Sequence, residues 1–263
     1  MKFRLVSGIA ITALMAGSAI AADMPLKAPP PVLAYDWSGF YIGGVIGGGW
    51  TRTETSTPGL GAVLLGVPVL QTTDSSSFIG GVEGGDRYQF GKLVIGWEAD
   101  MVWGSNNNAT STTAFGSGLV LAPGTVSRSL SADTKWAGTA TSTVGIAHDR
   151  WLIYGKAGVA WAKTDYTDIW TIAGAPLFSG TGSTSSSNQV GWTVGTGIEW
   201  AIWNNWSVKV EYDYLDFGQK TVAINGALGP GVTGFPVSLG LENTQHINQF
   251  KFGLNWHIMP NLW

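Results

Sequence analysis

Ten charged side chains recur at alternate positions within otherwise apolar segments, and they are the residues that could carry acid–base chemistry. Six are carboxylates and four are cations, and general acid–base catalysis needs positioned carboxylates of this kind. These acids come from several separate segments, however, and the alternation within each segment alone accounts for their positions. We therefore expect a polar lining rather than a catalytic centre, and no enzyme. The set is Glu83, Arg87, Glu98, Asp100, Lys156, Glu199, Lys209, Glu211, Asp213 and Lys251.

Other residues suited to nucleophilic or metal chemistry are sparse. Cysteine is absent, which excludes thiolate metal sites and thiol catalysis. The three histidines, His148, His246 and His257, are isolated from one another in the chain, and we expect no close Ser–His pair and no metal-ligand spacing. A lipid-modifying barrel enzyme with Ser and His at its surface remains an alternative. No catalytic, cofactor-binding or metal-binding residue is predicted.

The charged residues lie on segments in which apolar side chains occupy every second position. In residues 93–103 one face is wholly apolar and the other carries Glu98 and Asp100. Such alternation fits a tilted transmembrane β-strand, which needs roughly 9–11 residues. The pattern recurs along the chain, diluted in places by Gly and Thr. Eight strands are predicted, at residues 39–50, 78–90, 93–103, 134–147, 151–161, 190–202, 206–214 and 250–258.

The connections between these strands alternate in length. Short turns are expected at residues 90–92, 147–150 and 203–205. Long segments rich in Ser, Thr and Gly are expected as loops at residues 51–77, 104–133, 164–188 and 218–244. Short periplasmic turns and long outer loops are typical of outer-membrane barrels. The predicted fold is therefore all-β, an eight-stranded antiparallel transmembrane up-and-down β-barrel.

The composition favours a wall with one face in lipid. Charged residues make up 12% of the chain, against roughly 25% in soluble proteins, while Trp and Gly are abundant. The net charge is −3 and no basic cluster is present, so a nucleic-acid partner is not expected. Indole rings favour the boundary between hydrocarbon and headgroups, and eight Trp residues near strand ends are expected to form interfacial belts. They are Trp97, Trp103, Trp151, Trp161, Trp192, Trp200, Trp206 and Trp256.

The chain's first residues indicate export. Lys2 and Arg4 precede an apolar run, and small residues follow at Ala21 and Ala22, so residues 1–22 are predicted to be a cleaved secretory signal peptide. An uncleaved anchor is the alternative, but the apolar run is shorter than the roughly 20 residues that a spanning helix needs. Residues 23–36 are Pro-rich and are expected to form a flexible tether, and residues 37–263 are expected to form the barrel.

An eight-stranded barrel is only wide enough for side chains to fill it. We therefore expect the ten inner charges to pair and to block the lumen, because an unpaired buried charge costs several kcal/mol. A gated or water-filled pore for small hydrophilic solutes is the alternative. The apolar part of residues 59–70 is unusual for a loop, and it could extend a hairpin, cap the barrel mouth or contact a partner.

Four blocks of the chain resemble the small immunogenic outer-membrane proteins of α-proteobacteria, a porin-like family related to the membrane domain of outer membrane protein A. The blocks are WSGFYIGG at 37–44, DRWLIYG at 149–155, NWSVKVEY at 205–212 and FGLNW at 252–256. The resemblance implies an eight-stranded surface barrel that contributes to envelope integrity, with host contact or haem binding by the loops in some members. It also implies outer-membrane lipid and the barrel assembly machinery as partners, the latter reading Trp263 as a terminal signal.

Two positions depart from this family pattern. Alternate residues of a strand face opposite sides, and we call the side that a residue faces its parity. Asp86 has the parity of the lipid-facing residues, where an apolar or aromatic side chain is expected. It could lie near enough to the periplasmic turn to reach water, or a β-bulge could rotate it inward. The chain also continues past His257 to Pro260 and Trp263, whereas such barrels usually end within the last strand.

Overall fold

The computed structural model describes residues 35–56, 70–105, 109–116, 125–172, 175–182, 189–228 and 236–258. In these residues every regular element is a β-strand, and no helix there is long and apolar enough to cross a bilayer. The barrel lies within the compact unit Ala34–Trp263. The strands are β1 (Gly39–Ser56), β2 (Leu70–Phe90), β3 (Leu93–Ser105), β4 (Ala109–Gly116), β5 (Thr125–His148), β6 (Trp151–Ile172), β7 (Ala175–Gly182), β8 (Gln189–Ala201), β9 (Trp206–Leu228) and β10 (Pro236–Ile258).

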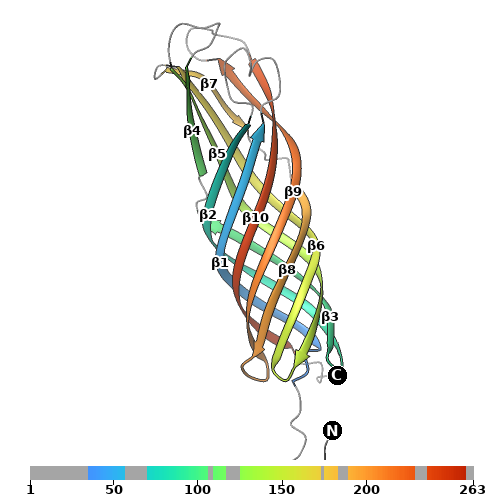
Figure 1. Ribbon diagram of the computed structural model, residues 1–263. Coiled ribbons are helices and arrows are strands. Elements are labelled where there is room, and N and C mark those ends of the chain that lie inside the picture. Colours follow the sequence, from blue (N-terminus) through green and yellow to red (C-terminus); the bar gives the residue numbers. More distant parts are fainter. Residues whose placement is uncertain are drawn as a thin grey trace, which may run out of the picture. The chain divides into compact units, whose positions relative to one another are not determined.

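All strand pairs are antiparallel, and the sheet closes because β1 pairs with β10 as well as with β2. Ten elements form only eight barrel strands, because two strands are interrupted. β3 and β4 both pair with β5, one after the other along it, and β8 and β7 share β6 in the same way. The predicted eight-stranded antiparallel barrel is confirmed, and Figure 1 shows its strands tilted around a common axis.

The strands continue well beyond their predicted ends, so the predicted limits of the long loops were wrong. β1 runs on through Thr51–Ser56, and β9 is 23 residues long, about twice what a membrane crossing requires. The alternation of apolar residues marks a strand only where one face contacts lipid. In Thr51–Ser56 both faces are polar and that contrast disappears, although Thr still favours extended backbone. The remaining upper connections, 57–69, 117–124, 173–174 and 229–235, lie outside the described residues.

The opposite end of the barrel has tight turns at the three predicted places, between β2 and β3, β5 and β6, and β8 and β9. Gly91 and Asp149 adopt positive φ values of 63° and 51° in the first two turns. Gly reaches this region without strain, and Asp is among the residues that tolerate it best. The short turns are therefore confirmed, and they define the periplasmic end of the barrel.

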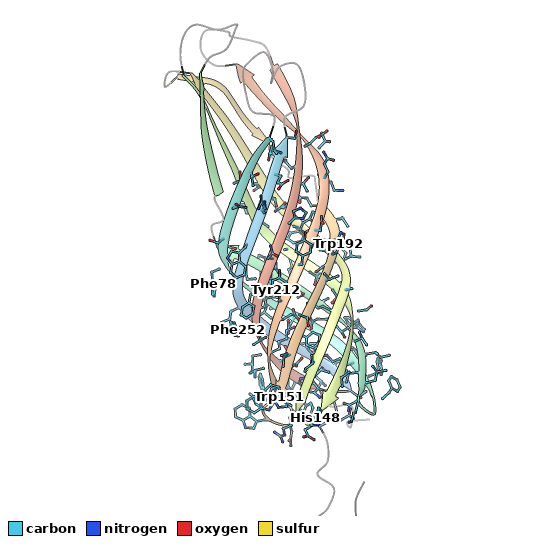
Figure 2. The ribbon with its side chains drawn as sticks, viewed as in Figure 1. Phe78, His148, Trp151, Trp192, Tyr212 and Phe252 are labelled. Atoms are coloured by element: carbon cyan, nitrogen blue, oxygen red, sulfur yellow. The ribbon has the colours of Figure 1, made fainter. Side chains whose placement is uncertain are left out.

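The outer wall is mostly apolar along the membrane-crossing part of the strands. Most large hydrophobic side chains that face outward from the strands are 37–63% exposed, and Figure 2 shows several of them, including Phe78, Trp151 and Phe252, projecting from the wall. Outward and inward residues alternate along β8, whose buried positions include Thr193 and Glu199. Such a surface needs lipid to cover it, which agrees with the predicted membrane location.

Several expectations fall on residues outside the described part of the chain. They concern the signal peptide at 1–22, the tether up to residue 34, the apolar loop segment up to residue 69, and the terminal signal Trp263. Asp86 is described, and the pairing of β2 with β1 and β3 runs past it without a register shift. The suggestion that a β-bulge turns Asp86 inward was therefore wrong, because the residue keeps its outward parity.

Candidate functional site in the barrel interior

The ten charged residues singled out from the sequence all lie inside the barrel, none more than 6% exposed. They come from six strands, with Glu83 and Arg87 on β2, Glu98 and Asp100 on β3, Lys156 on β6, Glu199 on β8, Lys209, Glu211 and Asp213 on β9, and Lys251 on β10. Each points inward because its neighbours in sequence occupy the lipid-facing positions. The barrel curvature then brings them into one layer, which we call the ionic layer.

Three lysines hold the ionic layer together, and each contacts at least three carboxylates. The Nζ of Lys156 lies near Glu211 (2.7 Å), Glu98 (2.9 Å), Asp213 (3.2 Å) and Asp100 (3.4 Å). That of Lys209 lies near Glu83 (2.7 Å), Glu98 (3.0 Å) and Glu211 (3.0 Å). That of Lys251 lies near Asp213 (2.6 Å), Glu211 (2.9 Å) and Asp100 (3.3 Å). Charge neutralisation at such short range is what makes burial of these groups tolerable.

The same contacts bear on metal binding. Among the described residues, two groups of three carboxylates have oxygens close enough together to hold a metal ion: Glu83, Glu98 and Glu211, and Asp100, Glu211 and Asp213. Lys209 contacts all three acids of the first group, and both Lys156 and Lys251 contact all three of the second. An ammonium group therefore already occupies the position that a metal ion would take in each group.

Arg87 connects the ionic layer to the periplasmic end of the lumen. Its Nη1 lies 2.8 Å from Glu199 Oε2, and its Nη2 lies 3.8 Å from Glu98 Oε2. The guanidinium carbon also sits 4.2 Å from the ring centroid of Tyr41 and 5.9 Å from that of Trp37. Ion pairing and cation–π attraction thus act together on one buried side chain.

Neutral hydroxyl donors complete the ionic layer. Two of them, Tyr41 and Thr139, are not among the residues predicted from the sequence. Tyr41 Oη donates to Glu98 Oε2 at 2.6 Å, and Tyr154 Oη donates to Glu211 Oε2 at 2.5 Å. Thr139 Oγ1 donates to Asp100 Oδ2 at 2.6 Å. Their inward parity is visible in the sequence, so parity applied to every polar residue, rather than to charges alone, would have found them.

One predicted absence was wrong, because the structure does contain a close Ser–His pair. Ser207 Oγ lies 2.7 Å from His257 Nε2, although the residues are 50 positions apart. Glu199 Oε1 lies 3.4 Å from the same Nε2 and also accepts a hydrogen bond from Ser207. A nucleophilic triad needs its acid on Nδ1, opposite the serine, and a serine that substrate can reach. Here acid and serine share one nitrogen and both are fully buried, so the arrangement is a structural hydrogen-bond cluster.

The other two histidines lie away from the lumen. His148 is in the turn between β5 and β6, where its Nδ1 is 3.6 Å from the exposed carboxylate of Asp149. His246 stacks on Tyr214, with ring centroids 5.9 Å apart, and its Nδ1 is within 3.5 Å of Asp216. Neither residue approaches the ionic layer, so these two histidines contribute nothing to the interior site.

Residues 35–38 close the periplasmic end of the lumen. Trp37 is fully buried, and its backbone N–H donates to Gln89 Oε1 at 2.8 Å. Its ring meets those of Tyr35 and His257 edge-on, at centroid distances of 4.8 and 5.7 Å. Burial raises the pKa of Tyr35 to about 12, so the phenol stays neutral at physiological pH. Trp37 therefore acts as an apolar stopper beneath the ionic layer.

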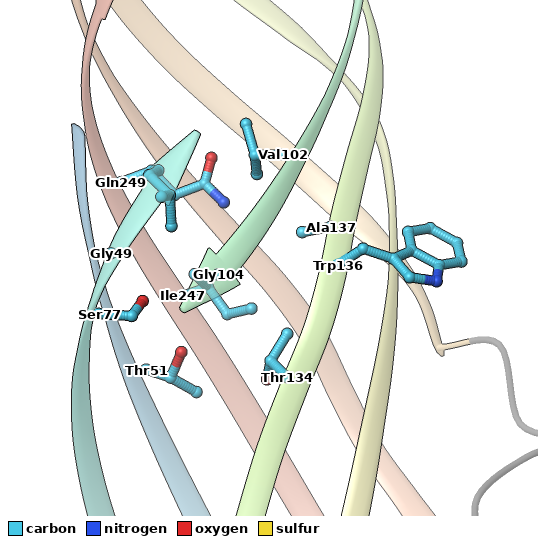
Figure 3. Close-up of a pocket in the computed structure, with 11 residues that line it drawn as sticks. Gly49, Thr51, Ser77, Val102, Gly104, Thr134, Trp136, Ala137, Ile247 and Gln249 are labelled. Carbon is cyan, nitrogen blue, oxygen red and sulfur yellow. The ribbon is translucent and has the colours of Figure 1, made fainter. Parts of the chain in front are cut away.

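A second apolar layer lies on the extracellular side of the ionic layer. It is formed by Val45, Ile79, Val102, Ala137, Ala160, Ala162, Leu215, Phe217 and Ile247. Figure 3 shows a small cavity at this level, where Thr51, Ile247 and Gln249 face Val102 and Thr134. Its volume of about 20 Å³ is enough for roughly one water molecule. The lumen thus contains, in order, an aromatic stopper, the ionic layer and an apolar layer.

The predicted Trp residues lie on the outer wall at two levels. Trp97, Trp151, Trp200, Trp206 and Trp256 lie towards the tight turns, whereas Trp103, Trp161 and Trp192 lie towards the other end. The rings of Trp151 and Trp200 stack with centroids 5.5 Å apart. Trp50 and Trp136 also lie at the level of Trp103, in segments where Gly and Thr dilute the alternation of apolar residues.

The narrow interior has room for some of its large side chains because a glycine faces them across the strands. Gly195 on β8 pairs with Asp213 on β9, and a Cβ at residue 195 would collide with the Asp213 carboxylate and lie 2.9 Å from the Tyr212 carbonyl oxygen. We expect Gly195→Val to destabilise the barrel by about 1–3 kcal/mol or to prevent folding, as overpacking does. Urea unfolding in lipid vesicles and the heat-dependent shift in gel mobility would measure this.

The matched control for this substitution is Gly155→Val. Gly155 has outward parity on β6, and the nearest atom to its Cβ would be the Gly195 carbonyl oxygen at 3.8 Å. A side chain there would extend into lipid, so we expect a change within about 0.5 kcal/mol, as for other surface positions. Equal destabilisation by the two valines would contradict the idea that the interior is filled.

Comparison with known proteins agrees with the fold and the location. Residues 9–257 match the family described as "Outer membrane protein beta-barrel domain". The chain is 29% identical to the 31 kDa outer-membrane immunogenic protein of Brucella melitensis, over 81% of this chain and 86% of that protein. It is 26% identical to the 22 kDa outer membrane protein of Rhizobium leguminosarum bv. viciae, over 84% of this chain and 82% of that protein.

Among solved structures, the outer membrane protein OprG from Pseudomonas aeruginosa aligns with 86% of this chain and 99% of the OprG chain. The sequence identity is 13% and the TM-score is 0.46. The family match covers nearly the whole described barrel, and the named relatives are outer-membrane proteins. The predicted outer-membrane location and the predicted resemblance are both confirmed. The chain therefore belongs to the outer membrane protein beta-barrel domain family.

Proposed function

We propose that this outer-membrane protein is a non-conducting structural barrel that supports the envelope and presents its extracellular strands and connections for surface interaction. The observation that carries the proposal is the ionic layer, in which three buried lysines and Arg87 bridge six carboxylates across the lumen. Moving an ion through this layer would require breaking several short ion pairs between fully or almost fully buried side chains.

The layers on either side support the same proposal. Below the ionic layer the fully buried Trp37 fills the mouth, and above it apolar side chains leave space for about one water molecule. A barrel of eight strands is just wide enough for its side chains to fill. A porin for small solutes, the main alternative, would need a continuous polar path, and the apolar layer of Val45, Ile79 and Leu215 interrupts any such path.

A surface-interaction role is supported by the length of the strands beyond the membrane. β5, β6, β9 and β10 each exceed 20 residues, so these strands extend well beyond the length that a membrane crossing needs. The Brucella relatives are named outer-membrane immunogenic proteins, which indicates that those proteins are exposed to a host immune system. We propose the same exposure here, without assigning a ligand to the connections.

Conductance across planar bilayers tests the proposal directly. We expect purified, folded protein to insert without producing unitary current steps, because the lumen has no continuous water-filled path. Insertion would be verified by recovery with the bilayer lipid and by the heat-dependent shift in gel mobility. A Trp37→Gly variant should also be silent, since the ionic layer remains in place. Reproducible current steps from the folded wild type would favour the porin alternative and reject the structural one.

A further inference from the structure

Asp86 is an outward-facing carboxylate on the membrane-crossing part of β2. It pairs with Phe40 on β1 and Trp97 on β3, both of which project from the outer wall. Its position four residues before the end of β2 places it roughly 10 Å from the periplasmic turn along the tilted strand. Trp97 beside it belongs to the lower Trp level, so Asp86 lies where hydrocarbon meets the headgroups of the periplasmic leaflet.

Asp86 is not in contact with water at this position, because it is only 4% exposed. The outward side chains next to it are Phe40 and Trp97 across the strands and Tyr88 two residues along β2, each 49–56% exposed. The Tyr88 hydroxyl donates a hydrogen bond to the carboxylate. A carboxylate among three aromatic rings is the combination that recognises organic ammonium groups, because both the ring faces and the carboxylate attract a cation.

An apolar groove on the same face begins beside Asp86. Its floor is formed by the small residues Gly84 and Ala99, and its volume is about 530 Å³. Its outward walls are formed by Phe40, Ile42, Val82, Trp97, Met101 and Ile258. Phe40 and Trp97 thus line both the groove and the surroundings of Asp86. The groove runs from the headgroup level towards the hydrocarbon, so its apolar part and its charged end face two different parts of a lipid molecule.

We propose that this groove binds one phospholipid of the periplasmic leaflet, with an acyl chain along Gly84 and Ala99 and the headgroup ammonium at Asp86. The occupant is a lipid rather than a free cation because the groove beside the carboxylate is apolar, lies on the membrane face and shares Phe40 and Trp97 with the surroundings of Asp86. Charge complementarity selects an ammonium headgroup, either ethanolamine or choline, over an anionic one. A second copy of the chain would have to bring a cation to the same level. Among the described strand residues at this level, no Lys or Arg faces outward, and the outward His148 at the end of β5 already lies 3.6 Å from Asp149.

Native mass spectrometry of the intact barrel tests the proposal. The protein would be released from vesicles with equal amounts of phosphatidylethanolamine, phosphatidylcholine and phosphatidylglycerol, all with the same acyl chains. We expect one retained lipid per barrel, with the two ammonium lipids preferred over phosphatidylglycerol by about tenfold, the effect of roughly 1.4 kcal/mol of cation recognition. The ratio of retained phosphatidylethanolamine to phosphatidylcholine then shows whether hydrogen-bond donation by a primary ammonium contributes to headgroup recognition.

Variants separate the two halves of the site. Asp86→Asn should abolish the headgroup preference and leave retention by the groove, and Trp97→Leu should weaken that preference. Ala99→Phe should remove retention of all three lipids by filling the groove, whereas Ala157→Phe, at an outward position on β6, should retain them as the wild type does. All four variants change lipid-facing side chains, and gel mobility verifies folding.

Three outcomes would overturn the proposal. They are equal retention of the three lipids by the wild type, an unchanged headgroup preference in Asp86→Asn, and a dimer of the wild type that is lost in Ala99→Phe.

Discussion

Lys209→Met is expected to destabilise the barrel by about 3–5 kcal/mol, the usual effect of removing one partner of a buried ion pair. Lys209 contacts three carboxylates, and among the described residues it is the one Lys or Arg within ion-pair distance of Glu83. Glu98 and Glu211 keep other cationic partners after the substitution, whereas Glu83 would be left as an uncompensated charge at 5% exposure. Methionine keeps the length and apolar stem of lysine, so lost charge rather than lost volume is measured.

Urea unfolding of the refolded protein in lipid vesicles, followed by Trp fluorescence, would measure the change. Lys135→Met is the matched control, because Lys135 pairs with Asp133 on an exposed surface, and we expect less than about 1 kcal/mol from it. Adding Glu83→Gln to Lys209→Met should recover more than about 1 kcal/mol, because the orphaned charge is then removed. If the double variant is no more stable than Lys209→Met alone, the stability lost in Lys209→Met does not arise from the unpaired charge of Glu83.

The outer wall could be predicted from the sequence because lipid imposes a strict requirement at every second position. Leu254 and Trp256 face outward on β10 while Lys251 and Asn255 face inward, as their alternation predicted. The requirement ends where the hydrocarbon ends. Thr51 to Ser56 continue β1 with no apolar contrast between their two faces, so their pairing with β2 and β10 had no signature in the sequence.

The candidate site was predictable as a set of inward residues but not as a set of contacts. Parity alone placed Lys209 and Glu83 in the lumen. Their contact depends on how β2 and β9, which are not neighbours in the sheet, approach each other across the barrel. The Ser207–His257 pair depends on the register between β9 and β10. Register and barrel stagger arise from all eight strands together, and no single segment encodes them.

Asp86 illustrates the same limit on the outer face. Its outward parity could be seen in the sequence, and the structure keeps it outward. Its shielding could not be seen, because the covering rings of Phe40 and Trp97 come from two other strands and reach it only in this register. A polar residue in a lipid-facing pattern is therefore a reason to look for cross-strand aromatic neighbours.

Substitution of Arg87 is expected to cause the second large loss of stability, and a lysine at this position should not restore the stability of the wild type. Arg87 is the one Lys or Arg of the described residues within 4 Å of Glu199. The same guanidinium lies 4.2 Å from the ring centroid of Tyr41 and within 6 Å of the ring centroids of Trp37 and Tyr154. Arg87→Met should cost about 3–5 kcal/mol, because Glu199 would keep only neutral donors and His257. Arg87→Lys should recover less than half of this loss, since a compact ammonium cannot reach Glu199 and also cover the Tyr41 ring face.

Coupling between Arg87 and Trp37 shows whether the stopper and the ionic layer act as one unit. In a double-mutant cycle with Trp37→Leu and Arg87→Met, measured by urea unfolding in vesicles, we expect a coupling energy of about 0.5–3 kcal/mol. The coupling arises because each substitution removes the same cation–π contact and loosens the same end of the lumen. Trp151→Leu, on the outer wall and distant from Arg87 in the strand pairing, is the control and should be additive. Additivity of Trp37 and Arg87 would mean that the stopper closes the periplasmic mouth independently of the charges above it.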